Sequence, residues 1–144
     1  MFFGEYEHTI DTKGRVIIPA KLREELGDVF MITKGLDGCL SVYSMDQWAA
    51  FEAKLQALPM NQPDARAFAR FFFSGATEGE LDKQGRVMLP PNMREHAHLT
   101  KDVVIAGAGN RLEIWDKATR DQYLTTTASP EEMAAKMSDM GFLI

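Results

Sequence analysis

The sequence predicts an α+β protein in which two pseudo-symmetric β-hairpin repeats interlock to form a small barrel-like unit with peripheral helices. The first observation behind this fold class is an internal repeat, in which Asp11-Thr12-Lys13-Gly14-Arg15 returns as Asp82-Lys83-Gln84-Gly85-Arg86. The second is that β-branched and other apolar residues flank each copy. The third is size, because half of a 144-residue chain is too small to bury a stable core by itself.

Each copy of the repeat predicts a β-hairpin closed by a short turn. Asp at the first position of the turn and Gly at the last position are typical of a type I turn. The Asp carboxylate is expected to accept hydrogen bonds from N–H groups of its own turn, and Gly14 and Gly85 are expected to be left-handed. The predicted strands are residues 7–10 with 15–18 in the first hairpin, and the second hairpin spans residues 80–89.

A short helix, two strands and two longer helices are expected after the first hairpin. Pro19 is suited to the first turn of a helix that Gly27 ends. Residues 28–33 and 39–43 then have the composition and alternation of strands. Ser44 opens a capping-box pattern, and the helix that it begins ends before Pro59. A second helix covers residues 63–73.

The helix over residues 63–73 has an unusually apolar surface. Four rings, Phe68, Phe71, Phe72 and Phe73, lie on it. We expect them to form the core between the two halves, and a subunit interface is the alternative use of such a surface.

The second copy repeats this plan and adds a tail. A short helix follows Pro90-Pro91, strands are expected near 102–106 and 111–115, and Asp116 can cap a helix. Ser129 begins a last helix, whose apolar stripe of Met133, Met137 and Met140 is suited to core packing or to an adaptable contact surface. The expected organisation is a first repeat over residues 1–58, a connecting helix over 59–76, a second repeat over 77–124 and a helical tail over 125–144.

Composition indicates an ordinary globular protein, with 45% hydrophobic and 26% charged residues. No apolar run approaches the ~18 residues of a membrane span, and the N-terminus has no secretory signal pattern. Cys39 is the single cysteine, so an intrachain disulfide and a cysteine metal cluster are excluded. We therefore expect a cytoplasmic protein in which Cys39 is a small core residue.

Catalytic patterns are weak in this sequence. Asp11 and Asp82 could in principle form a proton-sharing dyad, as duplicated halves do in aspartic proteases. Each Asp, however, has an Arg four residues later, and a nearby guanidinium favours the ionised carboxylate. The three histidines show no metal-ligand spacing, and no glycine-rich phosphate motif occurs. The sequence thus predicts neither an enzyme nor a metal site, cofactor or small-molecule substrate.

Cationic side chains at the two turns favour binding. Lys13 and Arg15 in the first copy have Lys83 and Arg86 as cationic counterparts in the second. A β-ribbon fits the major groove of DNA, where Arg can bind guanine and Lys can contact phosphate. The simpler interpretation is that each Arg only braces its turn by pairing with Asp. A net charge of −5 opposes nonspecific nucleic-acid binding, so a protein-interaction module remains an alternative.

Four segments carry a family resemblance, namely residues 8–15, 18–23, 66–75 and 82–86. They contain the duplicated Asp-x-x-x-Arg and, after the first copy, a Pro-x-x-x-Arg. From residue 1 to about residue 123 the chain resembles the MraZ family of bacterial transcriptional regulators, of the AbrB-like swapped-hairpin class. The residues after Tyr123 carry no clear family pattern.

The resemblance implies a function and a set of site residues. Members of the family bind G-rich direct repeats in the promoter of their own division and cell-wall operon, mainly repress it, and assemble into rings. They would thus be cytoplasmic and nucleoid-associated. By position, Arg15 and Arg86 would contact DNA while Asp11 and Asp82 hold them. Because Gln84 stands where the first copy has Lys13, the first copy is expected to contribute more.

Overall fold

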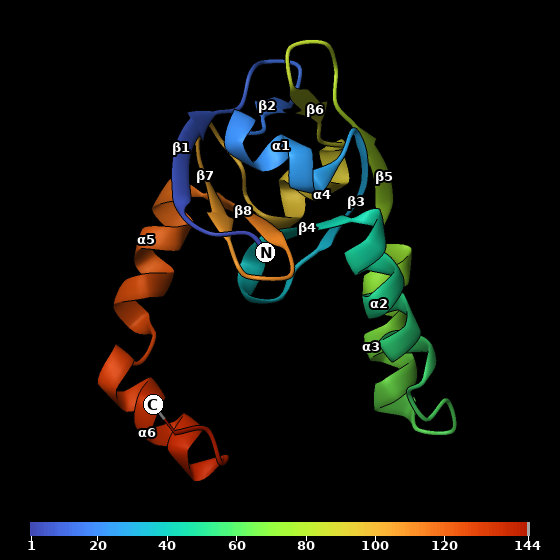
Figure 1. Ribbon diagram of the computed structural model, residues 1–144, viewed down its shortest axis with the longest axis vertical. Coiled ribbons are helices and arrows are strands. Elements are labelled where there is room, and N and C mark those ends of the chain that lie inside the picture. The colour runs from blue at the N-terminus through green and yellow to red at the C-terminus, as the bar shows by residue number, and fades with distance from the viewer. Residues whose placement is uncertain (144) are drawn as a thin grey trace.

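The computed structural model describes residues 1–143. In this part of the chain an antiparallel six-stranded sheet and a separate two-stranded ribbon are surrounded by six α-helices (Figure 1). The predicted α+β class is therefore confirmed. None of the described helices has the length and apolar character needed to span a membrane. The last residue of the predicted tail lies outside the described residues.

The elements follow the predicted order, with ends that differ from the predictions by a few residues. The strands are β1 Glu5–Thr9, β2 Arg15–Ile17, β3 Val29–Lys34, β4 Leu40–Ser44, β5 Thr77–Glu80, β6 Arg86–Met88, β7 Asp102–Gly107 and β8 Leu112–Asp116. The helices are α1 Ala20–Leu26, a 3-10 turn η1 Leu36–Gly38, α2 Met45–Gln56, α3 Pro63–Ser74, α4 Pro91–His96, α5 Lys117–Thr126 and α6 Pro130–Asp139.

The large sheet has the strand order β1-β7-β8-β4-β3-β5. The pairs β7–β8 and β3–β4 each come from one repeat, whereas β1–β7, β8–β4 and β3–β5 join strands of different repeats. β1 and β5, the equivalent strands before the two turns, form opposite edges of it. Within residues 1–143 no strand ladder joins these two edges. The closed, barrel-like sheet that the sequence predicts is therefore not confirmed.

The two predicted β-hairpins need a correction. β1 pairs with β7 rather than with β2, and β5 pairs with β3 rather than with β6. One backbone bond joins the two ends of each turn, from Asp11 N–H to Arg15 O at 3.0 Å and from Asp82 N–H to Arg86 O at 2.8 Å, and a second lies within each turn, from Gly14 N–H to Asp11 O and from Gly85 N–H to Asp82 O. Beyond these bonds the chain diverges, and β2 pairs with β6 of the other repeat.

The core explains why the strands separate. Val16 in β2 and Val87 in β6 are 0% and 1% exposed, and they lie in one cluster with residues of the large sheet. α1 contributes Leu22 and Leu26 to this cluster, and α4 contributes Met93. A hairpin formed within one repeat would leave its apolar side uncovered, whereas the exchanged pairing buries both sides in a common core.

The phenylalanines of α3 are not the core between the halves, so that prediction is wrong. α3 packs with α2 beside β3, where Phe72 is 4% exposed and stacks edge-on against Phe51, with ring centroids 5.1 Å apart. The Thr33 hydroxyl donates to Phe72 O at 3.0 Å and fixes the helix to the sheet. Phe68 and Phe73 remain 43% and 37% exposed. The alternative use in a subunit interface stays a prediction.

α5 and α6 form an arm at the other side of the sheet, below β1 in Figure 1. The Asp116 carboxylate caps α5 by accepting from Thr119 N–H at 3.1 Å, and Tyr123 packs on Trp115. α6 begins with the predicted capping box of Ser129 and Glu132. No residue of α6 is buried, so its methionine stripe does not pack into the core of this chain.

Candidate nucleic-acid interface

The first turn is built by the Asp11 carboxylate. Its Oδ1 accepts the backbone N–H groups of Lys13 and Arg15, both at 2.9 Å. Gly14 N–H donates to Asp11 O at 3.0 Å. Gly14 has φ 83°, which lies in the left-handed region of backbone conformation. This conformation costs a residue with a side chain ~1 kcal/mol or more. The predicted roles of Asp11 and Gly14 in organising the turn agree with this geometry.

The second turn has the same geometry despite its different tip residues. Asp82 Oδ1 accepts the N–H groups of Gln84 and Arg86 at 2.9 Å, and Gly85 has φ 76°. Lys83 and Gln84 are exposed, as Thr12 and Lys13 are in the first turn. The Asp and Gly positions therefore determine the turn, whereas the two residues between them are open to variation.

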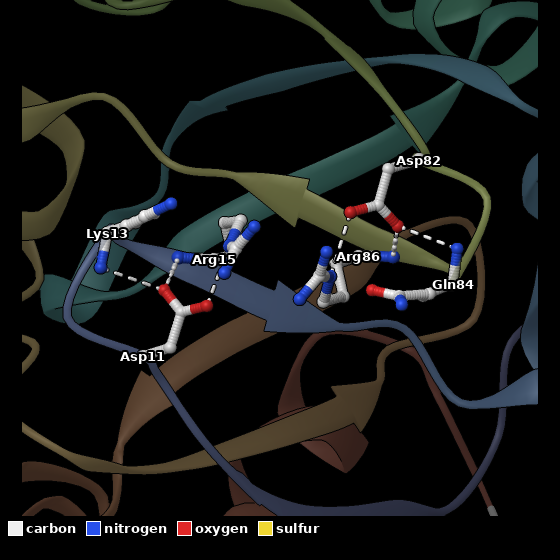
Figure 2. A network of polar contacts seen from close by, with 6 residues as sticks. All are labelled: Asp11, Lys13, Arg15, Asp82, Gln84 and Arg86. Carbon is white, nitrogen blue, oxygen red and sulfur yellow. Dashed lines mark hydrogen bonds and ion pairs between the residues drawn. The ribbon is translucent and has the colours of Figure 1, made fainter.

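Each Asp also holds the arginine that follows the turn. Arg15 Nε donates to Asp11 Oδ2 at 2.7 Å, and Arg86 Nε donates to Asp82 Oδ2 at 2.8 Å (Figure 2). Both arginine side chains are 26% exposed. Among the described residues no acceptor binds the terminal Nη groups of either arginine, so both groups remain available to a ligand.

The exchanged pairing places the two arginines on one surface. In the β2–β6 register Arg15 lies opposite Met88 and Arg86 lies opposite Ile17. Because side chains alternate along a strand, these four residues share the outward face while Val16 and Val87 point into the core. The arginines are thus diagonal neighbours, for which Cα separations of ~7–8 Å are usual, and Figure 2 shows them between the two turns.

Sequence reasoning expected two separate cationic loops, and the structure has one two-stranded ribbon with a turn at each end. We call the ribbon of β2 and β6 with its two turns the arginine ribbon. Lys13 lies at one end of it, where its side chain is exposed, and Gln84 lies at the other end (Figure 2). Lys83 is exposed beside Gln84 in the second turn.

Two arginines beneath the turns were missed as site residues. Arg23 Nε donates to Ile18 O at 2.7 Å, and Arg94 Nε donates to Leu89 O at 3.0 Å. Each guanidinium lies against the glycine of the opposite repeat, since a Cβ added at Gly85 would overlap Arg23 and one added at Gly14 would lie 2.8 Å from Arg94 Cζ. The sequence signal that could have identified these two arginines is their equivalent position in the two repeats, since Leu22-Arg23-Glu24 aligns with Met93-Arg94-Glu95.

Ile17 and Met88 were also missed. They are 39% and 59% exposed on the outward face of the arginine ribbon, although both belong to apolar strand sequences. Strand alternation from Arg15 and Arg86 would have placed them there. An exposed apolar side chain beside arginine is suited to contact a thymine methyl group in a major groove.

The electrostatics of the turns oppose the aspartic dyad. The backbone N–H of Arg15 lowers the pKa of Asp11, with smaller contributions from the Arg15 side chain and Lys13 N–H. The backbone N–H of Arg86 lowers the pKa of Asp82 in the same way. A dyad would instead raise the pKa of one carboxyl group because two carboxylates share one proton. Each carboxylate faces its own turn in Figure 2.

Cys39 and His96 both take part in packing. Cys39 is 1% exposed, as predicted for a core residue, and burial raises the pKa of its thiol to about 12. His96 Nε2 lies 3.1 Å from Gly35 O and is part of the packing of α4. Within residues 1–143 no group of three or more His, Cys, Asp or Glu side chains could hold one metal ion.

The surroundings of the two turns differ in charge. Ile10 N–H, just before the first turn, donates to Lys101 O at 2.8 Å, and Lys101 lines an open pocket with Asp11 and Thr12. At the equivalent place before the second turn, Leu81 N–H donates to Asp28 O at 2.9 Å. A cationic residue thus stands beside the first turn and an acidic residue beside the second. The expectation that the first copy contributes more to binding stays a prediction.

The chain is thus an α+β protein in which two equivalent repeats each place an Asp-braced arginine on one exchanged ribbon. Comparison with known proteins gives the family. The model of the family described as "MraZ protein, putative antitoxin-like" matches residues 1–71 and again 72–141. The chain therefore belongs to the MraZ family.

Individual relatives agree with this assignment. A protein of Moorella thermoacetica is 59% identical over 140 residues, which are 96% of this chain and 98% of the relative. A protein of Thermoanaerobacter sp. is 56% identical over 141 residues, covering 97% of this chain and 99% of the relative. Both relatives are named transcriptional regulator MraZ.

The contact of Gly85 with Arg23 predicts a specific loss of stability. Gly85→Ala should destabilise the fold by more than the ~1–3 kcal/mol of left-handed strain, because its Cβ would displace the Arg23 guanidinium and break the hydrogen bond from Arg23 Nε to Ile18 O. Gly38→Ala is the matched control, since Gly38 has φ 82° and open space around it. Urea unfolding measures both. Equal losses at the two positions, or no recovery in Gly85→Ala with Arg23→Ala, would contradict the packing described here.

The lowered pKa values of Asp11 and Asp82 predict an acid-sensitive turn. A carboxyl whose pKa is lower in the folded state adds stability above its ordinary pKa, and this stability is lost as pH falls through the lowered value. The urea midpoint of Asp11→Asn with Asp82→Asn should therefore fall less than that of the unmodified chain between about pH 5 and pH 2. Asp121→Asn, which removes an exposed carboxylate inside α5, is the control for loss of a charge alone.

Proposed function

We propose that this protein is a sequence-specific DNA-binding regulator of transcription that reads promoter DNA with the arginine ribbon. Membership of the MraZ family and the names of its relatives support a role in transcription. The observation that carries DNA binding is the paired arrangement of Arg15 and Arg86. Each is fixed through Nε by an aspartate, and the Nη groups of each are left without an acceptor among the described residues.

This arrangement is suited to base recognition. Arginine discriminates guanine by a bidentate contact to O6 and N7, and prior orientation of the guanidinium lowers the entropy lost on binding. A two-stranded ribbon is narrow enough to enter the major groove. The strand register and the neighbouring positions of Arg15 and Arg86 support a reading of closely spaced guanines, in line with G-rich target sites.

The cations around the ribbon are proposed to contact phosphates. Lys13 and Lys83 lie at the two turns, and Lys101 lies beside the first. Lysine is a compact point charge that suits a phosphate oxygen. Since the second turn has Gln84 and the neighbouring Asp28, we propose that the first turn makes the stronger backbone contact.

Assembly would reconcile an acidic chain with DNA binding. A single copy has a net charge of −5 and one small cationic surface, which predicts weak binding by itself. We infer that several copies form a ring, so that neighbouring ribbons bind neighbouring direct repeats with a high effective concentration. The division into two AbrB-like repeats with a connecting helix and a tail belongs to the same proposal, and the exchanged β2–β6 pairing supports it.

In the cell this function would be repression. A regulator bound across the promoter repeats of its own division and cell-wall operon would block transcription of that operon. It would lie in the cytoplasm in association with the nucleoid.

Arg15 is expected to be needed for specific binding. Arg15→Ala should weaken binding to G-rich repeats upstream of the gene by ~1–3 kcal/mol for each engaged copy, with a smaller loss in Arg86→Ala. Lys13→Ala is the matched control: it should weaken binding to all duplexes alike and reduce the slope of log affinity against log salt by about 1. Footprinting with salt titration measures both. Unchanged operator affinity in folded Arg15→Ala would refute the proposal, and binding of no duplex at all would favour a protein-interaction module.

The charges beside the two turns should act in opposite directions. Lys101→Gln should reduce the salt slope and the affinity, because one phosphate contact is lost. Asp28→Asn should raise affinity at low salt, with a gain that disappears as the Debye length falls to ~3 Å near 1 M salt. Fluorescence anisotropy with a labelled duplex measures these changes. A loss of affinity in Asp28→Asn would contradict the proposed role of the surroundings.

A further inference from the structure

The outward face of the arginine ribbon carries two apolar side chains between its cations. Ile17 and Met88 are 39% and 59% exposed there. Val16 and Val87, their neighbours along the same strands, are 0% and 1% exposed in the shared core. The folded chain thus buries the inner face of the ribbon and leaves apolar surface in water on the outer face. This exposure has a free-energy cost that a bound partner can remove.

Each of these apolar side chains lies directly opposite one arginine. Met88 faces Arg15 across the ribbon, and Ile17 faces Arg86. Residues that are directly opposite in an antiparallel pair have Cβ atoms ~4.5–5.5 Å apart, and residues two positions apart on one strand are separated by ~7 Å. Because β2 and β6 belong to different repeats, the exchange of strands forms two mixed pairs, each with an arginine from one repeat and an apolar side chain from the other.

The chemistry of such a pair matches two neighbouring bases at the major-groove edge of DNA. Guanine offers the acceptors O6 and N7 to an arginine, and thymine is the base that offers an apolar group, the methyl group on C5. Successive bases of one strand are ~3.4 Å apart along the helix axis. An apolar side chain ~5–7 Å from the arginine therefore reaches a base about one or two positions from the guanine.

Two other uses of Ile17 and Met88 fit the surroundings less well. A wall that shields the ion pairs from water is one of them, but the aspartate side chains of these pairs are still 36% and 38% exposed. An apolar patch on another protein is the second. Such a patch would bury the Nη groups of Arg15 and Arg86 without acceptors, which is strongly unfavourable. A partner that offers acceptors and apolar groups side by side meets both requirements, as a DNA groove does.

We propose that Ile17 and Met88 are specificity-determining residues, each of which contacts the methyl group of a thymine close to the guanine that the opposite arginine binds. The inference rests on the proposed reading of G-rich DNA by the arginine ribbon, and it adds thymine to the bases that the ribbon recognises. Each combination of guanine and thymine is then read by residues of both repeats, so neither repeat has a complete reading surface of its own.

The test removes the methyl group from the DNA and leaves the protein unchanged. In a duplex with the G-rich repeats from upstream of the gene, each thymine within about two base pairs of a repeat guanine is replaced in turn by deoxyuridine. Deoxyuridine keeps O4 and the pairing with adenine and lacks only the methyl group. Affinity should fall about fourfold at a contacted position, which corresponds to ~0.8 kcal/mol for one methyl group. Deoxyuridine outside the repeats is the control, and fluorescence anisotropy at constant salt measures both.

Protein variants then assign the methyl contact to its residue. Ile17→Ser and Met88→Ser replace exposed side chains by one that is too short and too polar to contact the methyl group, and thermal unfolding checks that each variant folds. Each variant should bind the thymine and deoxyuridine duplexes equally at the position that its natural side chain contacts, and should still prefer guanine. Met45→Ser, at an exposed methionine that begins α2, is the matched control and should keep the full sensitivity to the methyl group.

A duplex with 7-deazaguanine, which lacks the N7 acceptor, separates this inference from the proposed function. If 7-deazaguanine lowers affinity while deoxyuridine has no effect, or if the bound repeats have no thymine near a guanine, the apolar contact is refuted and the arginine reading stands. A deoxyuridine effect that persists in Ile17→Ser with Met88→Ser also refutes it, because DNA shape or another residue then causes the effect. Insensitivity to both base analogues refutes base reading by the ribbon, and the inference with it.

Discussion

The exchange of β2 and β6 between the two repeats is the interaction on which the rest of the structure depends. Ile18 N–H donates to Gly85 O and Leu89 N–H donates to Gly14 O, so each turn is bonded to the strand of the other repeat. The same pairing buries Val16 and Val87 in a common core and turns both arginines outward. One set of backbone bonds therefore joins the two halves, closes the core and forms the surface that is proposed to bind DNA.

Asp11 and Asp82 connect the fold to its proposed chemistry. One carboxylate oxygen satisfies two N–H groups of the turn, and the other orients a guanidinium through Nε. The carboxylate thus contributes to a rigid turn and to a directed arginine at the same time. The Arg23 guanidinium lies against Gly85, and the Arg94 guanidinium lies against Gly14. Each turn therefore contacts its own aspartate and an arginine of the opposite repeat, whose Nε is bonded to a backbone carbonyl.

The six helices fall into two groups, those that cover the shared core and those that extend away from it. α1 and α4 cover the core shared by the repeats, whereas α2, α3, α5 and α6 extend from the two ends of the sheet and keep apolar surface exposed. Exposed apolar surface of this kind has an energetic cost in a monomer, because it remains in contact with water. The proposed DNA binding by an acidic chain and the coverage of these surfaces would both follow from the proposed assembly of several copies.

The sequence by itself determined most local features and which residues form the two turns. Asp, Gly and Pro fix their own backbone and hydrogen bonding, so the turns, caps and helix starts at Asp11, Gly14, Asp116 and Ser129 were predictable. Only the tertiary structure decided which strands pair. The turn sequence predicts a hairpin, but burial of Val16 and Val87 in a common core favours exchange, and local sequence does not encode that partner choice. The exchange of strands also places Arg15 and Arg86 on one surface. The rings of α3 lie outside the core between the halves, and the sequence could not show this because burial depends on residues that are distant in sequence.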